Sequence, residues 1–451
     1  MSHDTGQQTN LLDAAYNPAP ATGEHIPHVV AWNITQRCNL ECAHCYISAG
    51  PSAPTDKDLT VAECRRITDE ILAINPNPMF ILTGGEPLSR PDLEQIAAYA
   101  SDFGATVVVG TNGTGLTPAR IQSLMASGVK GVAISIDSLQ TRYHNRFRHG
   151  DEALEQTLAG VTAMQEAGLD FIVQTTLTSF NRGEIDDLVA WSVEHGAVSF
   201  NLYFLVETGR GTGMKGLTPE QNDEALRDLV RLQKQYRGQI LIRSKCQPAL
   251  MRHVHELDPT SPIADYSTRC PCGVQYCRIT PDGKLTPCPY LPEVAGDLRT
   301  QSFGEIWNSS PLFQTIRAGG LGGKCGSCEF RKVCGGCRAR AFADSGDVMA
   351  ADESCGYQPT GDVPVIEPKA VAYGGAAPKL ELRWAPEAEA RMSRIPSFVR
   401  GVVMKRVEDF ASREGHTEIT LELLDSVRKN MPIDFSKRLP FFMRGKDKKD
   451  D

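Results

Sequence analysis

Between residues 28 and 206, short apolar runs rich in β-branched residues alternate with longer segments in which apolar residues recur every three or four positions. The short runs predict strands and the longer segments predict amphipathic helices. Alternation of this kind favours a parallel sheet with right-handed crossovers. We therefore expect an α/β fold with a partial (β/α)6 barrel of the TIM type. The predicted strands are 28–35, 79–85, 106–113, 131–137, 171–178 and 199–206, and the predicted helices are 60–74, 91–103, 117–127, 152–167 and 184–195.

The alternation stops near residue 236, which divides the chain. A tail (1–27) and a barrel domain (28–235) are expected to precede that point. The loop-rich segment 236–360 holds ten of the 14 cysteines, so a metal centre is expected to organise it. Residues 361–380 resemble a Pro, Gly and Ala linker.

A small helical domain with a charged tail is predicted over 381–451. Pro396 can start a helix at its first turn, Gly415 supplies a stop, and Thr420 can cap a second helix. The apolar face of the first helix would comprise Val399, Val402, Val403, Val407, Phe410 and Ala411.

Composition narrows the class of protein. The chain has 451 residues, of which 41% are hydrophobic, and a net charge of -8. An acidic balance gives no reason to expect nucleic acid as a partner. Neither a signal peptide nor an apolar run of about 20 residues is present, so we expect a cytoplasmic protein that is not inserted in a membrane. In a reducing compartment, cysteines indicate metal or redox ligation rather than disulfides.

Three thiols lie on the loop after the first predicted strand, in the stretch "CNLECAHC". Cys38, Cys42 and Cys45 can bind three corners of a metal centre and leave one position open. A structural zinc site needs a fourth ligand, for which His44 is the local candidate. An iron-sulfur cube with three cysteine ligands instead leaves one iron free for an exogenous ligand.

This C-x3-C-x2-C loop, together with "TGGEP" at the end of the second strand, resembles the radical S-adenosylmethionine (SAM) superfamily. The resemblance implies that Gly84, Gly85, Glu86 and Pro87 form the motif whose backbone receives the amino group of SAM. It also implies SAM contacts for Asn112 in "GTNG", for Ser135 and Asp137 in "SID", and for Gln174.

The family's chemistry is reductive cleavage of SAM at the open 4Fe-4S cluster, which gives a 5'-deoxyadenosyl radical that abstracts hydrogen from a substrate. Cys38, Cys42 and Cys45 would then be the catalytic metal ligands, and a donor such as ferredoxin or flavodoxin would reduce the cluster. A non-catalytic iron-sulfur electron-transfer protein is the alternative, but a relay has no use for an open iron.

Nine further thiols lie between residues 270 and 355, which is one more than two fully ligated clusters require. The pattern resembles the SPASM extension of radical SAM enzymes, with Gly283 and Cys288 in a G-x4-C element and Cys325, Cys328 and Cys334 in a C-x2-C-x5-C element. Cys337 follows Cys334 after two residues rather than the usual three. Two structural zinc sites are the alternative.

The SPASM resemblance implies two auxiliary clusters, and so three 4Fe-4S clusters in all. It assigns Cys272, Cys277, Cys288 and Cys337 to the first and Cys325, Cys328, Cys334 and Cys355 to the second, with Cys270 as an alternative to Cys272. Cys64 and Cys246 have no partners in sequence and are interpreted as buried core residues.

Two segments favour a tetrapyrrole substrate. "CGGCRARAFADSGDVMAADESC" and "CRITPDGKLTPCPYLPEVAGDL" resemble enzymes of the siroheme-dependent haem and d1 haem routes, which remove or oxidise carboxylate side chains. The C-terminal residues Trp384, Pro396, Phe398, Val399 and Arg400 resemble the small helical domain of light-independent protochlorophyllide reductase. A dimerisation or stabilising appendage is the alternative for that domain.

Substrate carboxylates would suit arginine, and substrate iron would suit histidine. The candidates are Arg142, Arg146, Arg148 and Arg210, and His144, His149, His253 and His255. The rival enzyme class is a SPASM maturase that modifies a ribosomally made peptide. Such maturases often carry a peptide-binding domain of about 80 residues before the barrel, where this chain has only about 27.

Overall fold

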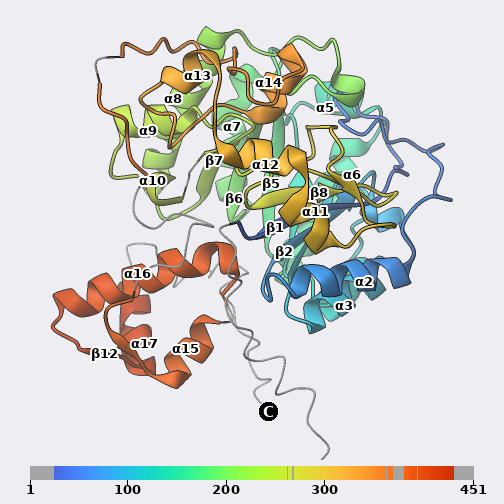
Figure 1. The fold of residues 1–451 in the computed structure, drawn as a ribbon. Coiled ribbons are helices and arrows are strands. Elements are labelled where there is room, and N and C mark those ends of the chain that lie inside the picture. Colours follow the sequence, from blue (N-terminus) through green and yellow to red (C-terminus); the bar gives the residue numbers. More distant parts are fainter. Residues whose placement is uncertain are drawn as a thin grey trace, which may run out of the picture.

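A computed structural model describes residues 25–261, 263–266, 269–361, 363–368, 380–393 and 395–430 (Figure 1). Most of the expected N-terminal tail, much of the linker and the charged tail after residue 430 lie outside the described residues. The side chain of Phe398 lies outside them too.

A curved, mostly parallel sheet forms the centre of the molecule, with strand order β10-β9-β8-β1-β2-β3-β4-β5-β6-β7 (Figure 1). All pairs from β8 through β1 to β7 are parallel, which confirms the predicted barrel class. The six predicted strands are β1 (Val29–Thr35), β2 (Met79–Gly84), β3 (Thr106–Thr111), β4 (Gly131–Ser135), β5 (Phe171–Leu177) and β6 (Ser199–Phe204).

Two parallel strands extend the predicted six. β7 (Leu241–Lys245) pairs with β6, and β8 (Tyr276–Ile279) pairs with β1. The hydrophobic pattern does not predict them because "LIRSK" and "YCRI" carry charged or aromatic residues at alternate positions. The sheet therefore continues beyond residue 235, where the sequence pattern places the end of the barrel.

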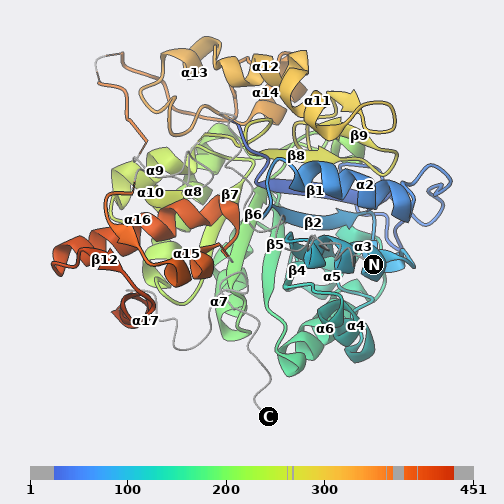
Figure 2. The ribbon, with the colours of Figure 1, turned by 60° about the horizontal axis from the view of Figure 1, so that its bottom comes forward.

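Helices cover the outer face of this sheet (Figure 2). Outward-facing side chains such as Trp32, Phe80 and Phe200 are fully buried against them in one core cluster. Thr60 and Thr218 form capping boxes with Glu63 and Gln221, which fixes where two of the helices begin. The covering helices are α2 (Val61–Leu72), α3 (Leu93–Asp102), α4 (Pro118–Ala126), α5 (Thr141–Arg148), α6 (Ala153–Ala167), α7 (Ile185–Glu194) and α8 (Pro219–Gln235).

The cysteine-rich segment folds over one edge of the barrel as short elements (Figure 2). β8 forms an antiparallel hairpin with β9 (Lys284–Thr286), which pairs with β10 (Gly296–Asp297). The helices of this segment are α9 (Leu250–Leu257), α10 (Ile263–Tyr266), α11 (Phe303–Ser309), α12 (Pro311–Ala318), α13 (Gly323–Ser327) and α14 (Arg338–Ser345).

The C-terminal domain lies below the barrel in Figure 1. Its elements are β11 (Arg383–Trp384), α15 (Pro386–Met392), α16 (Ser397–Arg413), β12 (Glu418–Ile419) and α17 (Leu421–Asn430). The start of α16 contacts the loop that precedes β2: Ser397 N–H donates to Asn77 O at 3.2 Å, and Arg400 Nη2 donates to Asn77 Oδ1 at 2.7 Å. Ser397 Oγ also lies 2.7 Å from His28 Nδ1. The domain therefore docks at the N-terminal ends of β1 and β2.

The core of this domain contains one buried carboxylate. Val399, Val403 and Val407 of α16 are buried as predicted, and Glu408 lies beside them with 2% of its surface exposed. Its oxygens accept hydrogen bonds from Trp384 Nε1 and from the backbone N–H of Leu382, both at 3.1 Å, and of Glu381. Glu408 thus holds the segment that leads into the domain.

Replacing Glu408 with Ala should destabilise the C-terminal domain by about 3 kcal/mol, because the buried Trp384 indole N–H and two partly buried backbone N–H groups would lose their acceptor. Amide hydrogen exchange in α15, α16 and α17 should become faster while exchange in the barrel is unchanged. Glu414→Ala, at the exposed end of the same helix, is the matched control and should behave as the unmodified chain. Equal exchange in the two variants would contradict the role of Glu408.

Candidate active site

The loop after β1 brings Cys38, Cys42 and Cys45 into one small cluster of side chains. Burial, with Glu86 and the other two thiols, raises the pKa of Cys38 to about 12. Backbone N–H groups of Leu40 and Ala49 donate to Cys38 Sγ at 3.4 Å and to Cys45 Sγ at 3.3 Å. Amide donors aimed at sulfur stabilise thiolate, the form that binds iron, so this donor set fits an iron-sulfur cluster.

The glycine motif of β2 packs directly on that loop. Gly85 N–H donates to Thr35 O and Glu86 N–H donates to Arg37 O, both at 2.8 Å. A Cβ on Gly85 would lie 2.1 Å from Arg37 O, and one on Gly84, whose φ is +134°, would lie 2.3 Å from Thr35 O. Only glycine permits this approach of two backbones.

The side chain of Glu86 joins the ends of β2 and β3. It accepts hydrogen bonds from Thr111 Oγ1 at 2.7 Å and Asn112 N–H at 2.9 Å, and its pKa is raised by burial. It also caps the short helix that starts at Pro87, which is buried. Asn112 Nδ2 in turn donates to Asn39 Oδ1 at 2.8 Å, beside Cys38. Glu86 and Asn112 thus hold the thiol loop in place.

A second brace comes from the loop after β6. Arg210 Nε donates to Cys42 O at 3.0 Å, and Arg210 N–H donates to Cys45 O at 3.0 Å. Gly209, with φ +59°, lies so close that a Cβ would be 2.4 Å from Cys45 O. Arg210 therefore holds backbone carbonyls of the thiol loop, a role that the sequence analysis missed. The Gly-rich stretch "ETGRGTG" was the available signal.

Asp137 and Arg148 form a buried ion pair behind the thiols. Arg148 Nη2 lies 2.7 Å from Asp137 Oδ2, and both side chains are 8% exposed or less. Burial opposes ionisation of Asp137, but Arg148, His44 and His144 hold its pKa below the ordinary value. Arg148, a candidate for a substrate carboxylate, is therefore already paired with a buried carboxylate of the chain itself. The ends of β4 and β5 converge here, because Thr176 N–H donates to Asp137 Oδ1 at 2.8 Å.

The other candidates from the sequence are more scattered. Arg142, Arg146 and His149 are exposed on or next to α5. His253 is buried and lies 3.2 Å from Asp223, and the ring of His255 contacts Phe330. His144 Nδ1 accepts from Asp137 N–H at 3.3 Å, and His44 stacks on Phe147 with ring centroids 4.5 Å apart. The buried His144 and His253 therefore each have a structural contact within the chain.

The inward face of the barrel is polar. Residues of β5, β6, β7 and β8 that alternate with core residues point inward, because successive strand residues face opposite sides. Gln174 Nε2 donates to Tyr203 Oη at 3.2 Å, and Tyr203 is paired in register with Lys245. The inward positions near the strand ends include Ser135, Gln174, Tyr203, Lys245, Tyr276 and Arg278. These side chains give the inward face of the barrel its polar and aromatic character.

Lys245 is a cation that the sequence analysis missed. Burial and the nearby Arg243 lower its pKa to about 8. Among the residues that the structure describes, no carboxylate lies within ion-pair distance of its ammonium group. A cation in this position is suited to an anionic ligand.

The second group of auxiliary thiols lines one cavity, together with Lys324, Arg331 and Gly336. The backbone N–H of Phe330, Gly336 and Asp352 each lies 3.4 Å from a sulfur of this group. This donor set fits an iron-sulfur cluster on the same grounds as the first loop. The thiols are those of Cys325, Cys328, Cys334 and Cys355.

The first group of auxiliary thiols is composed differently from the expectation. Cys272, Cys288 and Cys337 pack together, and Cys246 and Cys270 pack against them. Cys277 lies in β8 with its side chain in the apolar core, where Arg317 is the charged neighbour. The structure therefore does not bring Cys277 together with the other three thiols of the expected set. Cys64 is buried in the same apolar core, as interpreted.

No three Cys, His, Asp or Glu side chains among the described residues are grouped as ligands of a single metal ion. Thiols around a four-iron cube each bind a different iron, so they need not meet at one point. None of the described helices is long and apolar enough to cross a membrane.

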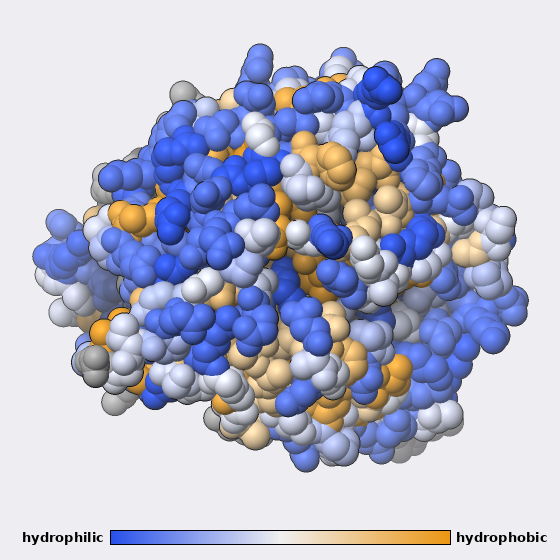
Figure 3. Space-filling model, turned by 90° about the horizontal axis from the view of Figure 1, so that it is seen from above, coloured by the Kyte–Doolittle hydropathy of each residue, from blue (hydrophilic) through white to orange (hydrophobic). Residues whose placement is uncertain are grey.

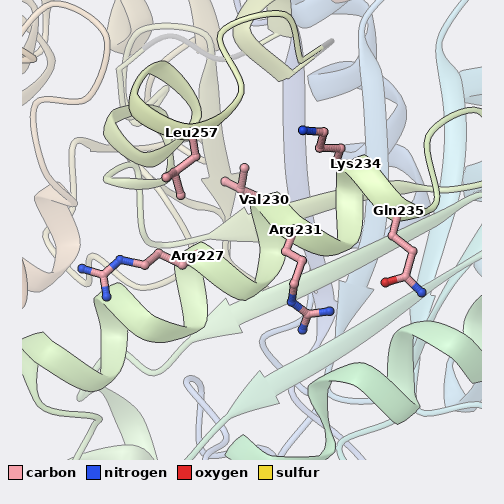
Figure 4. Close-up of a pocket in the computed structure, with 6 residues that line it drawn as sticks. All are labelled: Arg227, Val230, Arg231, Lys234, Gln235 and Leu257. Carbon is pink, nitrogen blue, oxygen red and sulfur yellow. The ribbon is translucent and has the colours of Figure 1, made fainter.

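Two further features of the surface are an apolar patch and a pocket. Seen from above, apolar residues gather near the middle of a largely hydrophilic face (Figure 3). A separate pocket lies on the outer side of α8, where Arg227, Val230 and Lys234 project beside Leu257 (Figure 4). It contains none of the residues discussed above, and we assign it no role.

Comparison with known proteins agrees with this geometry. Residues 32–191 match the radical SAM superfamily, residues 270–338 match the SPASM iron-sulfur cluster-binding domain, and residues 384–428 match the proto-chlorophyllide reductase 57 kD subunit. The crystal structure of Streptococcus suis SuiB matches with a TM-score of 0.59 and 17% identity over 74% of this chain and 78% of that one. That likeness concerns the fold.

Two relatives are closer in sequence. The AdoMet-dependent heme synthase of Methanosarcina barkeri is 38% identical over 343 residues, which cover 74% of this chain and 97% of the relative. The pre-heme d1 synthase of Dinoroseobacter shibae is 30% identical over 383 residues, which cover 77% and 91%. The chain therefore belongs to the radical SAM superfamily, among the enzymes that carry a SPASM domain. Within that class, both of these relatives are named for haem or d1 haem synthesis.

Replacing Gly85 with Ala should lower SAM cleavage about 100-fold, because the new Cβ would push the thiol loop away from the strand end. The measurement is 5'-deoxyadenosine formed per iron under reducing conditions. Gly183→Ala is the control, since a Cβ there meets nothing within 4 Å. Unchanged cleavage in Gly85→Ala would show that the close approach is not required.

Proposed function

We propose that this enzyme modifies carboxylate side chains of a tetrapyrrole, by oxidative decarboxylation or side-chain loss in haem or d1 haem synthesis. The observation that carries the proposal is the 38% identity to AdoMet-dependent heme synthase across 97% of that relative. The inward-facing Lys245 supports it, because a tetrapyrrole with several carboxylates would provide the anionic partner that this cation lacks.

In this proposal, separate groups of residues bind the cluster, bind SAM and orient the substrate. Cys38, Cys42 and Cys45 would hold the open 4Fe-4S cluster, and Gly84 to Pro87 with Asn112 would border the SAM site. SAM bound at such a cluster supplies hydrogen-abstracting chemistry after one-electron reduction, for which ferredoxin or flavodoxin would be the donor. The aromatic and polar residues of the barrel mouth would orient the substrate and exclude water.

Oxidative decarboxylation sets a further requirement. A propionate that loses a hydrogen atom and then its carboxyl group as CO2 becomes a vinyl group, and one electron is left over. Two fully ligated auxiliary clusters, held by the cysteine-rich segment, would suit the acceptance of that electron. We therefore propose three 4Fe-4S clusters in the chain.

The cluster content can be measured directly. After anaerobic reconstitution the chain should hold about twelve irons, and replacing Cys38, Cys42 and Cys45 together with Ala should leave about eight and abolish SAM cleavage. Cys64→Ala, a buried cysteine in the apolar core, should retain both the iron and the cleavage. A count near four, or zinc in place of iron, would refute the auxiliary clusters.

Incubation with iron-coproporphyrin III and with didecarboxysiroheme, followed by mass analysis, tests the substrate. Loss of carboxyl groups from either supports the proposal. If neither reacts while a short peptide encoded beside this gene is modified, the chain is a peptide maturase instead.

With the substrate that reacts, Lys245→Gln should raise KM about tenfold or more, because one charge-assisted hydrogen bond is lost. The value of kcat should change less, and Lys245→Arg should restore most of the affinity. Lys234→Gln on the exposed side of α8 is the control. An unchanged KM in Lys245→Gln would exclude Lys245 from substrate binding.

A further inference from the structure

Five thiols, rather than four, gather at the first auxiliary group. Cys272, Cys288 and Cys337 are buried together, and Cys246 and Cys270 pack against them. The thiol of Cys246 lies beside that of Cys337 and near that of Cys288. Cys272 contacts both Cys270 and Cys288. The contacts therefore run continuously from Cys272 through Cys288 and Cys246 to Cys337.

Cys277, which the sequence pattern favours, faces the other way. In β8 it is paired with Val30, and both side chains belong to the apolar core between the sheet and its helices. Its neighbour Arg278 is directed to the opposite face, where Nη1 donates to Pro289 O at 2.9 Å. Because strand residues alternate, Cys277 cannot turn toward the other thiols without moving β8 out of register.

The backbone directs Cys246 toward the group. Cys246 has φ +58°, a left-handed conformation that costs a residue other than glycine about 1 kcal/mol or more. Its carbonyl oxygen accepts a hydrogen bond from Arg340 Nη1 at 2.8 Å. Strain of this kind persists where surrounding contacts impose it, and it is commonest at functional sites.

Arg340 also connects the loop that holds Cys246 to the helix that follows Cys337. It lies on α14, three residues after Cys337, and is 7% exposed. Besides Cys246 O, it donates to Leu205 O at 3.1 Å and to Ser354 Oγ at 3.1 Å. One side chain thus joins the loop after β7 to α14, whose N-cap residue is Cys337, and the two thiols lie side by side.

We propose that Cys246 is a ligand of the first auxiliary cluster, together with Cys272, Cys288 and Cys337, and that Cys277 is not a ligand. This inference rests on the proposed presence of auxiliary clusters. Each thiol gives up its proton to solvent when it binds iron. Cys270, which contacts Cys272 and the backbone N–H of Arg338, remains outside the set.

The consequence is a direct link between that cluster and the barrel. Cys246 follows Lys245 at the end of β7, and Tyr203 and Tyr290 lie close to its thiol. A cluster held partly by Cys246 would border the proposed substrate space rather than be held only by residues 270–355. An electron leaving a substrate carboxylate group at Lys245 would have a short path to it.

Four variants test this assignment: Cys246→Ala, Cys270→Ala, Cys277→Ala and Cys64→Ala. Iron, acid-labile sulfide, and the Mössbauer and EPR spectra are measured after anaerobic reconstitution of the full chain. Cys246→Ala should lose about four of about twelve irons if the whole cluster is lost. It should lose about one if only the iron that Cys246 binds is lost. Cys270→Ala, Cys277→Ala and Cys64→Ala should retain the full count and unchanged spectra.

Substitution by a neighbouring thiol is controlled by making Cys246→Ala in the Cys270→Ala background, where the loss of iron should be at least as large. If Cys246→Ala does not fold, Cys246→Ser replaces it and should keep the iron but shift the EPR signal of one reduced cluster, since oxygen can replace sulfur as the ligand.

Unchanged iron and spectra in every Cys246 variant, or loss of a cluster in Cys270→Ala or Cys277→Ala, would overturn the assignment. A count near four in the unmodified chain would instead refute the auxiliary clusters themselves. The failure of this inference is therefore distinguishable from the failure of the proposed function.

Discussion

The contact between two backbones, that of the thiol loop and that of the glycine motif, is the constraint on which the site depends. Gly85 and Glu86 donate their N–H groups to the carbonyls of Thr35 and Arg37, which sets the loop before Cys38 against the end of β2. Arg210 and Gly209 fix the far end of the loop from β6. Three thiols on eight residues of irregular chain would otherwise have no fixed arrangement, and an open cluster needs one.

The charged groups of the barrel differ in whether the chain itself supplies their partner. Asp137 and Arg148 are buried as a pair, so each charge has a partner and the ends of β4 and β5 stay joined. Lys245 lies on the inward face with no carboxylate among the described residues at ion-pair distance. The first arrangement is structural, because its charges are already satisfied. The second is the kind expected where a ligand completes the site.

The two appended domains contact different parts of the barrel. Arg340 ties the cysteine-rich segment to the carbonyl ends of β6 and β7, next to the polar mouth. The C-terminal domain docks through Ser397 and Arg400 on Asn77, at the amino ends of β1 and β2. In this arrangement the C-terminal domain does not border the thiol loop. Its position fits a docking or stabilising role better than direct contact with the substrate.

The sequence by itself determined the elements and the local motifs. Apolar alternation specifies β1 to β6, because a buried parallel strand needs a continuous apolar face. The three thiols after β1, the glycine motif after β2 and the four thiols that line one cavity are each close enough in sequence to be recognised by spacing. Arg243 and Lys245 obscured β7, since a strand that faces a functional site carries polar residues where the pattern expects apolar ones.

Only the tertiary structure decided which residues from distant segments meet. Cys277 has a suitable spacing from Cys272, but the strand turns its side chain into the apolar core. Cys246 has no neighbour in sequence that suggests a ligand, but β7 brings it to Cys337, 91 positions away by their residue numbers. Likewise Arg148 resembled a substrate contact until burial beside Asp137 accounted for its charge. Spacing shows only which residues are close along the chain. The direction of a side chain depends on strand register, and its role depends on the residues that it contacts in the folded protein.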